Sequence, residues 1–272
     1  MKFKAIFLLF NLLTLLAFAL IAFMPVFVLG WEYTQVFWQG NWYFVVIFIA
    51  ILGGLNIYFG LNWKLFSLLE KEDWEGLSSL LETRIYEQNK ISRQHLRLLI
   101  NSYVVRSHPE KILNLEQHVL KHAPQLRDRF ALSFAVPRLL SNDPDRMLEY
   151  FETMSAREEV PDREWMLWGK GFALMLAHRA DEAREVLLTL AASVADPVLK
   201  LLTLYLLDAY RDVHEEAKRI VDEGKRALSD RYDMKAWQKE VNKHRGNLQV
   251  LVLSKLVRDA TNWAFRGGKS FT

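Results

Sequence analysis

Residues 43–75 decide the fold, and they read YFVVIFIAILGGLNIYFGLNWKLFSLLEKEDWE. The stretch carries no charged residue before Lys64, and charged residues return from Lys64 onward. A second uncharged run, Ala5–Trp31, lies upstream, and the rest of the 272-residue chain is charged and helix-patterned. This break in composition predicts an all-α protein in which a membrane hairpin, residues 1–63, carries a helical domain.

The hairpin is expected to cross a membrane twice. A helix needs roughly 20 apolar residues to cross the hydrocarbon core, and residues 5–29 and 43–62 supply two such spans. An external loop over residues 31–42 joins them and is rich in Trp and Tyr. Lysines flank the opposite ends of the two spans: Lys2, Lys4, Lys64 and Lys71. The positive-inside rule then predicts a multi-pass protein of the bacterial inner membrane with both termini in the cytoplasm, held in lipid through residues 5–62.

Four small or polar residues are expected to pack inside the hairpin. Asn11 and Asn56 lie at the same depth if the spans are antiparallel, so their amides can hydrogen-bond each other. Gly53 and Gly54 then allow a close approach of the two backbones. The alternative is that each amide bonds its own helix or an oligomer partner.

Charge is unevenly distributed over the chain, whose net charge is +3. Residues 218–269 carry thirteen Lys and Arg against six Asp and Glu, whereas residues 64–217 are net acidic. The basic end is read first as a solvated helix face, and second as a surface for anionic lipid or nucleic acid. The absence of cysteine excludes disulfides, thiolate metal sites and a cysteine nucleophile.

Residues 64–230 contain a repeat. Helical patterns are interrupted at short intervals, and two interruptions match in type: His108-Pro109-Glu110-Lys111-Ile112-Leu113 and Asp143-Pro144-Asp145-Arg146-Met147-Leu148. The first buried position after each interruption recurs at intervals of 35, 35, 36 and 34 residues: Leu77, Ile112, Met147, Ala183 and Ala217. A period in this range is typical of stacked helix pairs.

The repeat resembles the tetratricopeptide repeat (TPR) family, whose unit is a helix–turn–helix. Its best match is Leu167–Leu190, where Gly171 and Ala183 take the two small positions and Leu187 a core position. Glu116 departs from the pattern, since an aromatic residue is expected there. The resemblance implies a TPR-like α-solenoid of about four to five helical hairpins over residues 64–230. A related α-solenoid with irregular repeats is the nearest alternative.

The period is lost beyond Asp230. Residues 231–265 are expected to form one or two basic helices that cap the solenoid, with residues 266–272 as a disordered tail. The expected apolar stripe of the last helix ends at Trp263. The alternative is that this helix lies on the inner leaflet of the membrane.

No residue cluster indicates catalysis or a cofactor. His118 and His122 share a helix face at i, i+4, but the sequence fixes no third ligand, so we expect no metal site. Gly267-Gly268-Lys269-Ser270 lacks the strand and helix that flank a phosphate-binding loop. We therefore expect neither an enzyme nor a protein that binds a small-molecule substrate.

What remains is a protein-binding surface. In helical-hairpin solenoids the first helices of successive repeats line a concave face. On this chain the face would carry Gln94, Arg97, Asn101, Arg129, Leu132, Val136, Trp165, Trp168 and Phe172. Aromatic and Arg side chains dominate binding hot spots. For the two tryptophans and Phe172, however, burial in a core is favoured over binding.

The predicted function is a membrane-anchored scaffold or assembly factor that holds a protein partner. Two alternatives stay open: a non-catalytic subunit of a larger membrane complex, and a lipid- or nucleic-acid-binding module driven by the basic end. We do not expect nucleic acid to be the partner.

Overall fold

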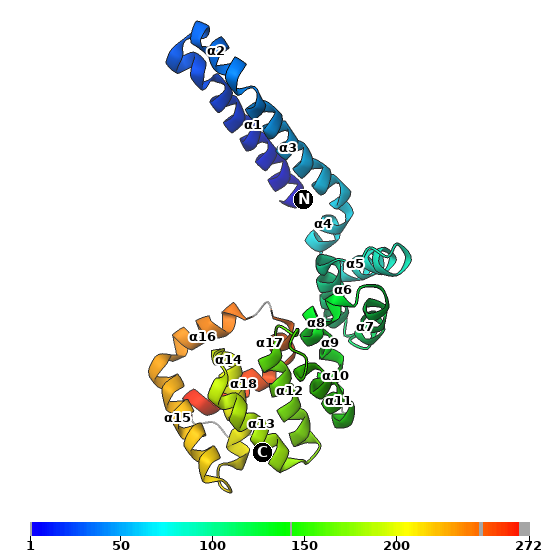
Figure 1. The fold of residues 1–272 in the computed structure, drawn as a ribbon, viewed down its shortest axis with the longest axis vertical. Coiled ribbons are helices and arrows are strands. Elements are labelled where there is room, and N and C mark those ends of the chain that lie inside the picture. Colours follow the sequence, from blue (N-terminus) through cyan, green and yellow to red (C-terminus); the bar gives the residue numbers. More distant parts are fainter. Residues whose placement is uncertain (1, 142, 245–246, 267–272) are drawn as a thin grey trace. The chain divides into compact units, whose positions relative to one another are not determined.

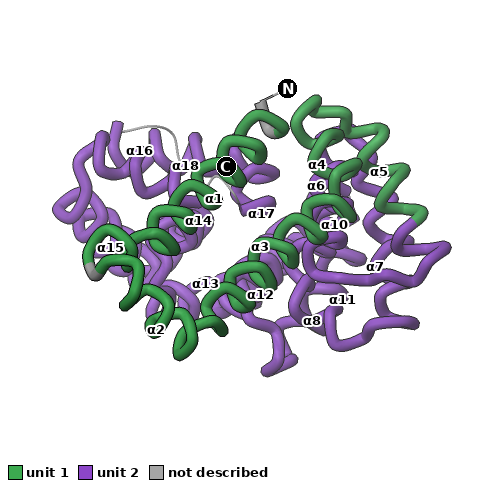
Figure 2. The backbone as a smooth tube through the Cα atoms, turned by 90° about the horizontal axis from the view of Figure 1, so that it is seen from above, with its two compact units in different colours: residues 1–83 green, residues 84–272 purple. Residues whose placement is uncertain are grey.

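Helices make up every regular element in the part of the chain that the computed structural model describes, residues 2–141, 143–244 and 247–266 (Figure 1). The all-α prediction is therefore confirmed. Figure 2 colours the two units into which the chain divides, residues 1–83 and 84–272. The sequence prediction for the tail, residues 267–272, lies outside the described residues.

The first unit contains two helices long and apolar enough to cross a membrane, over Lys4–Val28 and Tyr43–Leu61. They belong to α1 (Lys2–Leu29) and α3 (Tyr43–Leu61). Aromatic pairs join the two helices: the rings of Phe18 and Phe48 stack with centroids 3.9 Å apart, and those of Phe7 and Phe59 lie 5.0 Å apart. The two helices therefore run antiparallel as a side-chain-packed hairpin.

The segment expected to be a loop over residues 31–42 is a helix instead, α2 (Trp31–Asn41). Gly30 has a φ of 81°, a conformation that favours glycine, and it ends α1 and starts α2 in a new direction. The hydroxyl of Thr34 donates to the Gly30 carbonyl at 2.8 Å. The connection between the spans is therefore an ordered helical turn.

The second apolar helix, α3, ends at Leu61 and a short helix follows it directly. Asn62, with φ −104° and ψ 10°, separates α3 from α4 (Trp63–Glu70), and its side chain donates to the Tyr58 carbonyl. The helix α5 (Trp74–Glu82) follows, with the Asp73 carboxylate capping it through the Gly76 amide at 2.8 Å. The end of α3 cannot be recognised from composition, because it is marked neither by Gly nor by Pro but by Asn62, whose side chain bonds to a carbonyl of the same helix.

The second unit is a succession of helices of one to five turns. After the π-helical turn η1 (Thr83–Glu87), which spans the boundary between the units, they are α6 (Arg93–Val105), α7 (Lys111–His122), α8 (Gln125–Arg129), α9 (Ala131–Phe134), α10 (Val136–Leu139), α11 (Pro144–Ser155), α12 (Arg163–Leu176), α13 (Ala180–Ser193), α14 (Pro197–Leu207), the 3₁₀ turn η2 (Asp208–Tyr210), α15 (Glu215–Arg231), α16 (Met234–Lys243), α17 (Leu248–Val252) and α18 (Ser254–Arg266).

The five recurring positions predicted from the repeat are all buried. Leu77, Ile112, Met147, Ala183 and Ala217 are each at most 1% exposed. Asp143 caps the start of α11, as the sequence pattern predicts. Its carboxylate accepts a hydrogen bond from the Arg146 amide at 3.1 Å, and Pro144 is the first residue of the helix. The positions that recur in the sequence are therefore buried positions in the fold.

Glycine brings α12 close to its neighbours. A Cβ atom on Gly169 would lie 2.3 Å from the ring of Phe151 in α11, and one on Gly171 would lie 2.9 Å from Leu187 in α13. The small position assigned to Gly171 is thus occupied as expected. Helix α12 can pack closely against both α11 and α13 because glycine, which has no side chain, lies at each of these two contacts.

The segment 125–139 departs from a simple helical hairpin. It is broken into three short helices, with Phe130 (φ −107°, ψ 10°) between α8 and α9, and it buries Leu132 and Val136. These two residues were expected on an open face. They are in the core because the breaks turn α9 and α10 inward.

The C-terminal helices pack within the second unit. Helix α18 lies against α14 and α15 and buries Val257, Ala260, Trp263 and Ala264. Trp263, the expected end of the apolar stripe, is 2% exposed, whereas Leu251 on α17, before the break at Leu253, is 54% exposed. The apolar face that a membrane-bound helix would need is therefore buried within the protein.

Candidate functional site

The polar residues expected to bind a partner lie on α6 and α8. Gln94 and Arg97 are exposed on α6, and Asn101 is half-buried on the same helix. Arg129 lies on α8, where it lines a hollow of about 690 Å³ together with Arg93, and the α6 trio does not line that hollow. Because Arg93 is the first residue of α6, the hollow joins the start of that helix to α8, and a surface shared by the four polar residues stays a prediction.

The aromatic part of the predicted face is core. Trp165 is 7% exposed and Trp168 is 1% exposed, and the Trp168 ring stacks on Phe172 with centroids 5.3 Å apart. Phe172 is half-buried. For the two tryptophans the favoured core interpretation is confirmed and the binding anchor is wrong, because α12 is packed against α11 on one side and α13 on the other.

The asparagine pair in the hairpin is present. The Asn56 Nδ2 donates to Asn11 Oδ1 at 2.7 Å, while Asn11 Nδ2 donates to the Phe7 carbonyl at 2.9 Å. The role assigned to Gly53 and Gly54 is not observed, since a Cβ atom on either would meet nothing within 4 Å. Aromatic side chains hold the helices apart, so the glycines do not provide close backbone contact within the chain.

The histidine pair is a packed surface feature. The rings of His118 and His122 stack with centroids 4.2 Å apart, and burial, followed by the neighbouring His122, lowers the pKa of His118. Within the described residues no group of three His, Asp or Glu side chains is placed to hold a metal ion. The pair therefore has no third ligand in this part of the chain.

A buried ion cluster explains the unexpected Glu116. Its carboxylate is 2% exposed and lies 2.8 Å from the Arg138 guanidinium and 3.6 Å from that of Arg127. Arg138 also covers the ring of Tyr150, whose hydroxyl donates to the Ala131 carbonyl at 2.7 Å. Burial, followed by the Glu116 charge, raises the pKa of Tyr150, so the phenol stays neutral. The cluster ties α7 to α10 and α11, which is a structural role.

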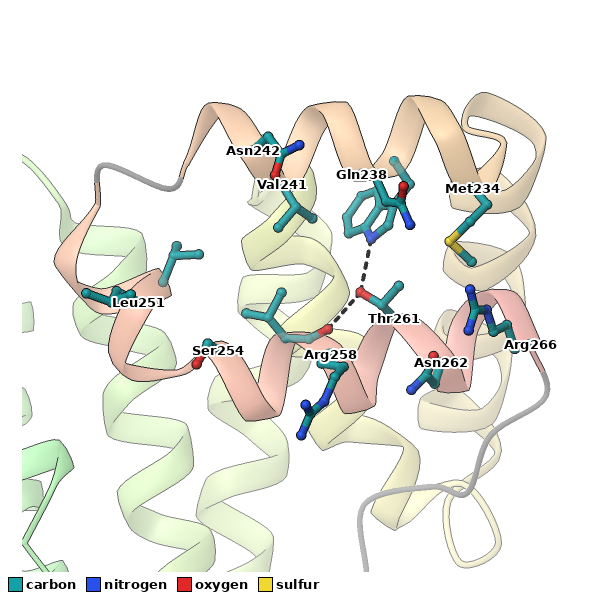
Figure 3. Close-up of a pocket in the computed structure, with 13 residues that line it drawn as sticks. Met234, Gln238, Val241, Asn242, Leu251, Ser254, Arg258, Thr261, Asn262 and Arg266 are labelled. Atoms are coloured by element: carbon teal, nitrogen blue, oxygen red, sulfur yellow. Dashed lines mark hydrogen bonds between the residues drawn. The ribbon is translucent and has the colours of Figure 1, made fainter.

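The most site-like feature is a groove of about 740 Å³ between α16 on one side and α17 and α18 on the other. This volume is within the range typical of ligand-binding clefts. Figure 3 shows Met234, Gln238 and Val241 pointing from α16 toward α18. Leu251 lies toward one end of the groove, and Met234 with Arg266 lies at the other.

The floor of the groove is apolar and fixed. The indole of Trp237, fully buried, donates to the Thr261 hydroxyl at 3.0 Å, and Thr261 donates to the Val257 carbonyl at 2.7 Å (Figure 3). Val250 and Val257 are buried beside it, while Val241 is half-exposed. The floor thus keeps its shape without a ligand.

Two rows of mainly polar side chains form the walls. On α18 the residues recur every fourth position, which places them on one helix face: Ser254, Arg258, Asn262 and Arg266. On α16 the row is Met234, Gln238 and Asn242. The lining includes two arginines and no acidic residue. The rim is therefore positive and rich in hydrogen-bonding groups.

Both walls are anchored from behind. The Trp263 indole donates to the buried Asp208 carboxylate at 2.8 Å and packs on Tyr205, which fixes α18 on α14. The Asp233 carboxylate caps α16 by accepting from the Ala236 amide at 2.6 Å. The groove is consequently a preformed feature of the unit.

The groove was missed in the sequence because the basic end was weighed as charge alone. The signal was the spacing of four between residues 254, 258, 262 and 266, and again between residues 234, 238 and 242. These rows predict two polar helix edges, but only the fold shows that they face one groove.

Comparisons with known proteins find relatives of one genus. A protein-family profile described as "Uncharacterised Treponema protein" matches residues 111–266, which include α7 to α18 and so the whole groove. A protein of Treponema pallidum (strain Nichols), described as an uncharacterized protein, is 30% identical over 281 residues that cover 97% of this chain and 88% of the relative. No solved structure gives a significant match to the chain.

Proposed function

Because this chain belongs to the family described as uncharacterised Treponema proteins, whose profile spans the groove, we propose that it is a membrane-anchored scaffold or assembly factor that docks a partner protein there. The hairpin crosses the inner membrane with both termini in the cytoplasm, and the helical domain is a TPR-like solenoid. The anchor raises the local concentration of the partner at the membrane.

The observation that carries the proposal is the groove itself. Its apolar floor is preformed, its walls are polar, and Leu251, 54% exposed, stands at its edge. Exposed apolar surface rimmed by polar groups is typical of protein-binding sites. The positive rim complements an acidic partner segment, which favours a protein over a neutral small molecule.

The proposal includes no catalytic step. The buried ionisable groups outside the groove already have partners that explain them, as Glu116 has with two arginines and Asp208 with Trp263 and Arg211. The recurrence of buried residues every 34 to 36 positions supports the solenoid part of the proposal.

Site-specific photo-crosslinking in the native membrane tests the function. A photoreactive residue placed at Leu251 is expected to give one defined protein adduct, identified by mass spectrometry. Adding Val241→Asp, which puts a charge on the floor, is expected to abolish the adduct. The matched control is the same photoreactive residue at Arg219 on α15, which is outside the groove and 64% exposed in its side chain.

Two results would overturn this function. One is the same set of adducts from residues 251 and 219, which would mean collisions without a site. The other is adducts found only from positions in the hairpin, such as Leu16, and none from the groove. That second result favours the alternative of a subunit held in a complex through its membrane helices.

A further inference from the structure

The groove also indicates what kind of partner segment it takes. We infer that it holds an amphipathic helix of about three turns whose apolar stripe is flanked by acidic side chains. This inference rests on the proposed function and deepens it by assigning the chemistry of the occupant.

The walls set the secondary structure of the occupant. The groove runs between two helices of 10 and 13 residues, which at ~1.5 Å per residue are roughly 15–20 Å long. The described residues contain no strand edge for an extended peptide to join. Trp237 is fully buried, so it offers no open aromatic face for a proline-rich segment. A helix laid along the two walls is the recognition mode that fits.

The accessible apolar atoms set the stripe of that helix. Met234 and Val241 on one wall are half-exposed, and Leu251 is exposed toward the far end. Three such contacts over this length match side chains at i, i+3 or i+4, and i+7 of a partner helix. The asparagine and glutamine side chains on the walls then lie beside the polar edges of the partner.

The charge of the rim sets the flanks. Arg258 and Arg266 are exposed on the same face of α18, two helical turns apart. The acids near the groove are engaged elsewhere: Asp233 caps α16, Glu240 lies 2.5 Å from Lys243, and Asp259 lies 4.0 Å from Arg258. Asp259 is the one of these acids that faces a rim arginine, and at 4.0 Å from the 71%-exposed Arg258 it lies at the outer limit of an ion pair. The rim therefore keeps a net positive charge that a partner with Asp or Glu two turns apart would meet, whereas a basic partner is repelled.

Binding of two designed peptides to the full chain tests the inference. Both peptides have the same leucine stripe over 16 residues, one flanked by Glu and the other by Lys. Each is fluorescein-labelled and titrated with the protein in nanodiscs of zwitterionic lipid, with empty nanodiscs as the blank. We expect at least tenfold tighter binding of the Glu peptide in fluorescence anisotropy, and weaker binding at higher salt.

Charge reversal supplies the decisive comparison. The double variant Arg258→Glu and Arg266→Glu changes only exposed side chains, and it is expected to reverse the preference in favour of the Lys peptide. The matched control, Lys218→Glu and Arg219→Glu, makes the same change in net charge on the exposed face of α15 and is expected to keep the Glu preference.

Several results would contradict the inference. Equal binding of both peptides, or a preference that the control variant also reverses, excludes charge recognition by the groove. Binding of anionic vesicles that is lost in the groove variant assigns the rim to lipid. Self-association at micromolar concentration that the same variant abolishes assigns the groove to a second copy. If the photo-crosslink at residue 251 persists while both peptides fail, the acidic helix is wrong and the docking function stands.

Discussion

At the scale of single residues, the helical domain depends on a carboxylate placed where an apolar side chain would be ordinary. Glu116 is buried between two arginines whose own side chains are 24% and 19% exposed, Arg127 and Arg138. Removing one member of a buried ion pair leaves its partners desolvated and unpaired, which costs more than the pair contributes. The two ion pairs thus hold the segment 125–139, which is broken into three short helices, against α7.

The first prediction concerns this cluster. Glu116→Gln is expected to lower the free energy of unfolding by about 3 kcal/mol, because two half-buried guanidinium groups lose their buried counter-charge. Urea unfolding of the full chain in detergent, followed by tryptophan fluorescence, measures the loss. Glu182→Gln is the matched control, since Glu182 pairs with Arg179 at 2.6 Å on an exposed helix start. Equal effects of the two substitutions would contradict the assignment.

The second prediction concerns pH. Burial and the neighbouring His122 lower the pKa of His118 below its ordinary value of 6.5, so the folded state favours the neutral ring. As the pH falls through about 6.5, the unfolded chain takes up this proton first, and stability is lost. The urea midpoint is therefore expected to drop less between pH 7.5 and 5.5 in His118→Gln than in the natural chain.

The control for this titration is His178→Asn. His178 is exposed, with a φ of 59° that asparagine tolerates. Its pH dependence is expected to match that of the natural chain. If the two variants behave alike, His118 does not contribute to the dependence.

At the scale of elements, close helix packing depends on positions that have no side chain, namely two glycines of α12. A Cβ atom on Gly169 would overlap the buried Phe151 ring, whereas one on Gly171 would press on the flexible end of Leu187. The helix-favouring effect of alanine is similar at both positions, so the difference reports packing.

The third prediction follows from this comparison. Gly169→Ala is expected to lower the free energy of unfolding by about 1–3 kcal/mol, because the aromatic ring must move within a packed core. Gly171→Ala serves as the control and is expected to cost less. Thermal unfolding of the two proteins side by side measures the difference, and a larger loss in Gly171→Ala would refute the packing argument.

The fourth prediction concerns the attachment of α18, which forms one wall of the groove. Trp263→Phe removes the indole that donates to Asp208 at 2.8 Å, leaving that 4%-exposed carboxylate with Arg211 at 3.3 Å. A loss of about 1–3 kcal/mol is expected, since a buried acceptor becomes under-satisfied. Hydrogen exchange is expected to quicken in α18 and to stay unchanged in α12. Uniform acceleration throughout the domain would argue against local anchoring.

The sequence predicted which segments are helical better than it predicted which helix faces are buried or exposed. The two long apolar helices, the repeat of buried positions and the small position at Gly171 were predictable because each depends on local pattern or fixed spacing. Burial of Trp165 and Trp168 was favoured from the sequence but not decided by it, since an aromatic stripe looks the same whether a neighbouring helix covers it or not. The groove was not predictable either, because its two walls become neighbours only through the packing of α18 on α14.

At the scale of the whole molecule, the proposed function requires the groove and the basic rim to lie on the cytoplasmic side. The two apolar helices that flank α2 place that helix on the opposite side, provided that both cross the membrane. The natural chain has no cysteine, so one introduced thiol reports one position without background.

The fifth prediction uses single cysteines at Gln39 in α2 and at Lys218 in α15. A membrane-impermeant maleimide added to intact spheroplasts is expected to label Gln39→Cys and to leave Lys218→Cys unlabelled until the membrane is disrupted. The converse pattern would place the helical domain outside and exclude a cytoplasmic partner. Labelling of both positions in intact spheroplasts would mean that only one helix crosses, because a single crossing puts α2 and α15 on the same outer side if the N-terminus is inside. Since the groove and Lys218 belong to the same unit, the labelling of Lys218→Cys decides which compartment supplies the partner.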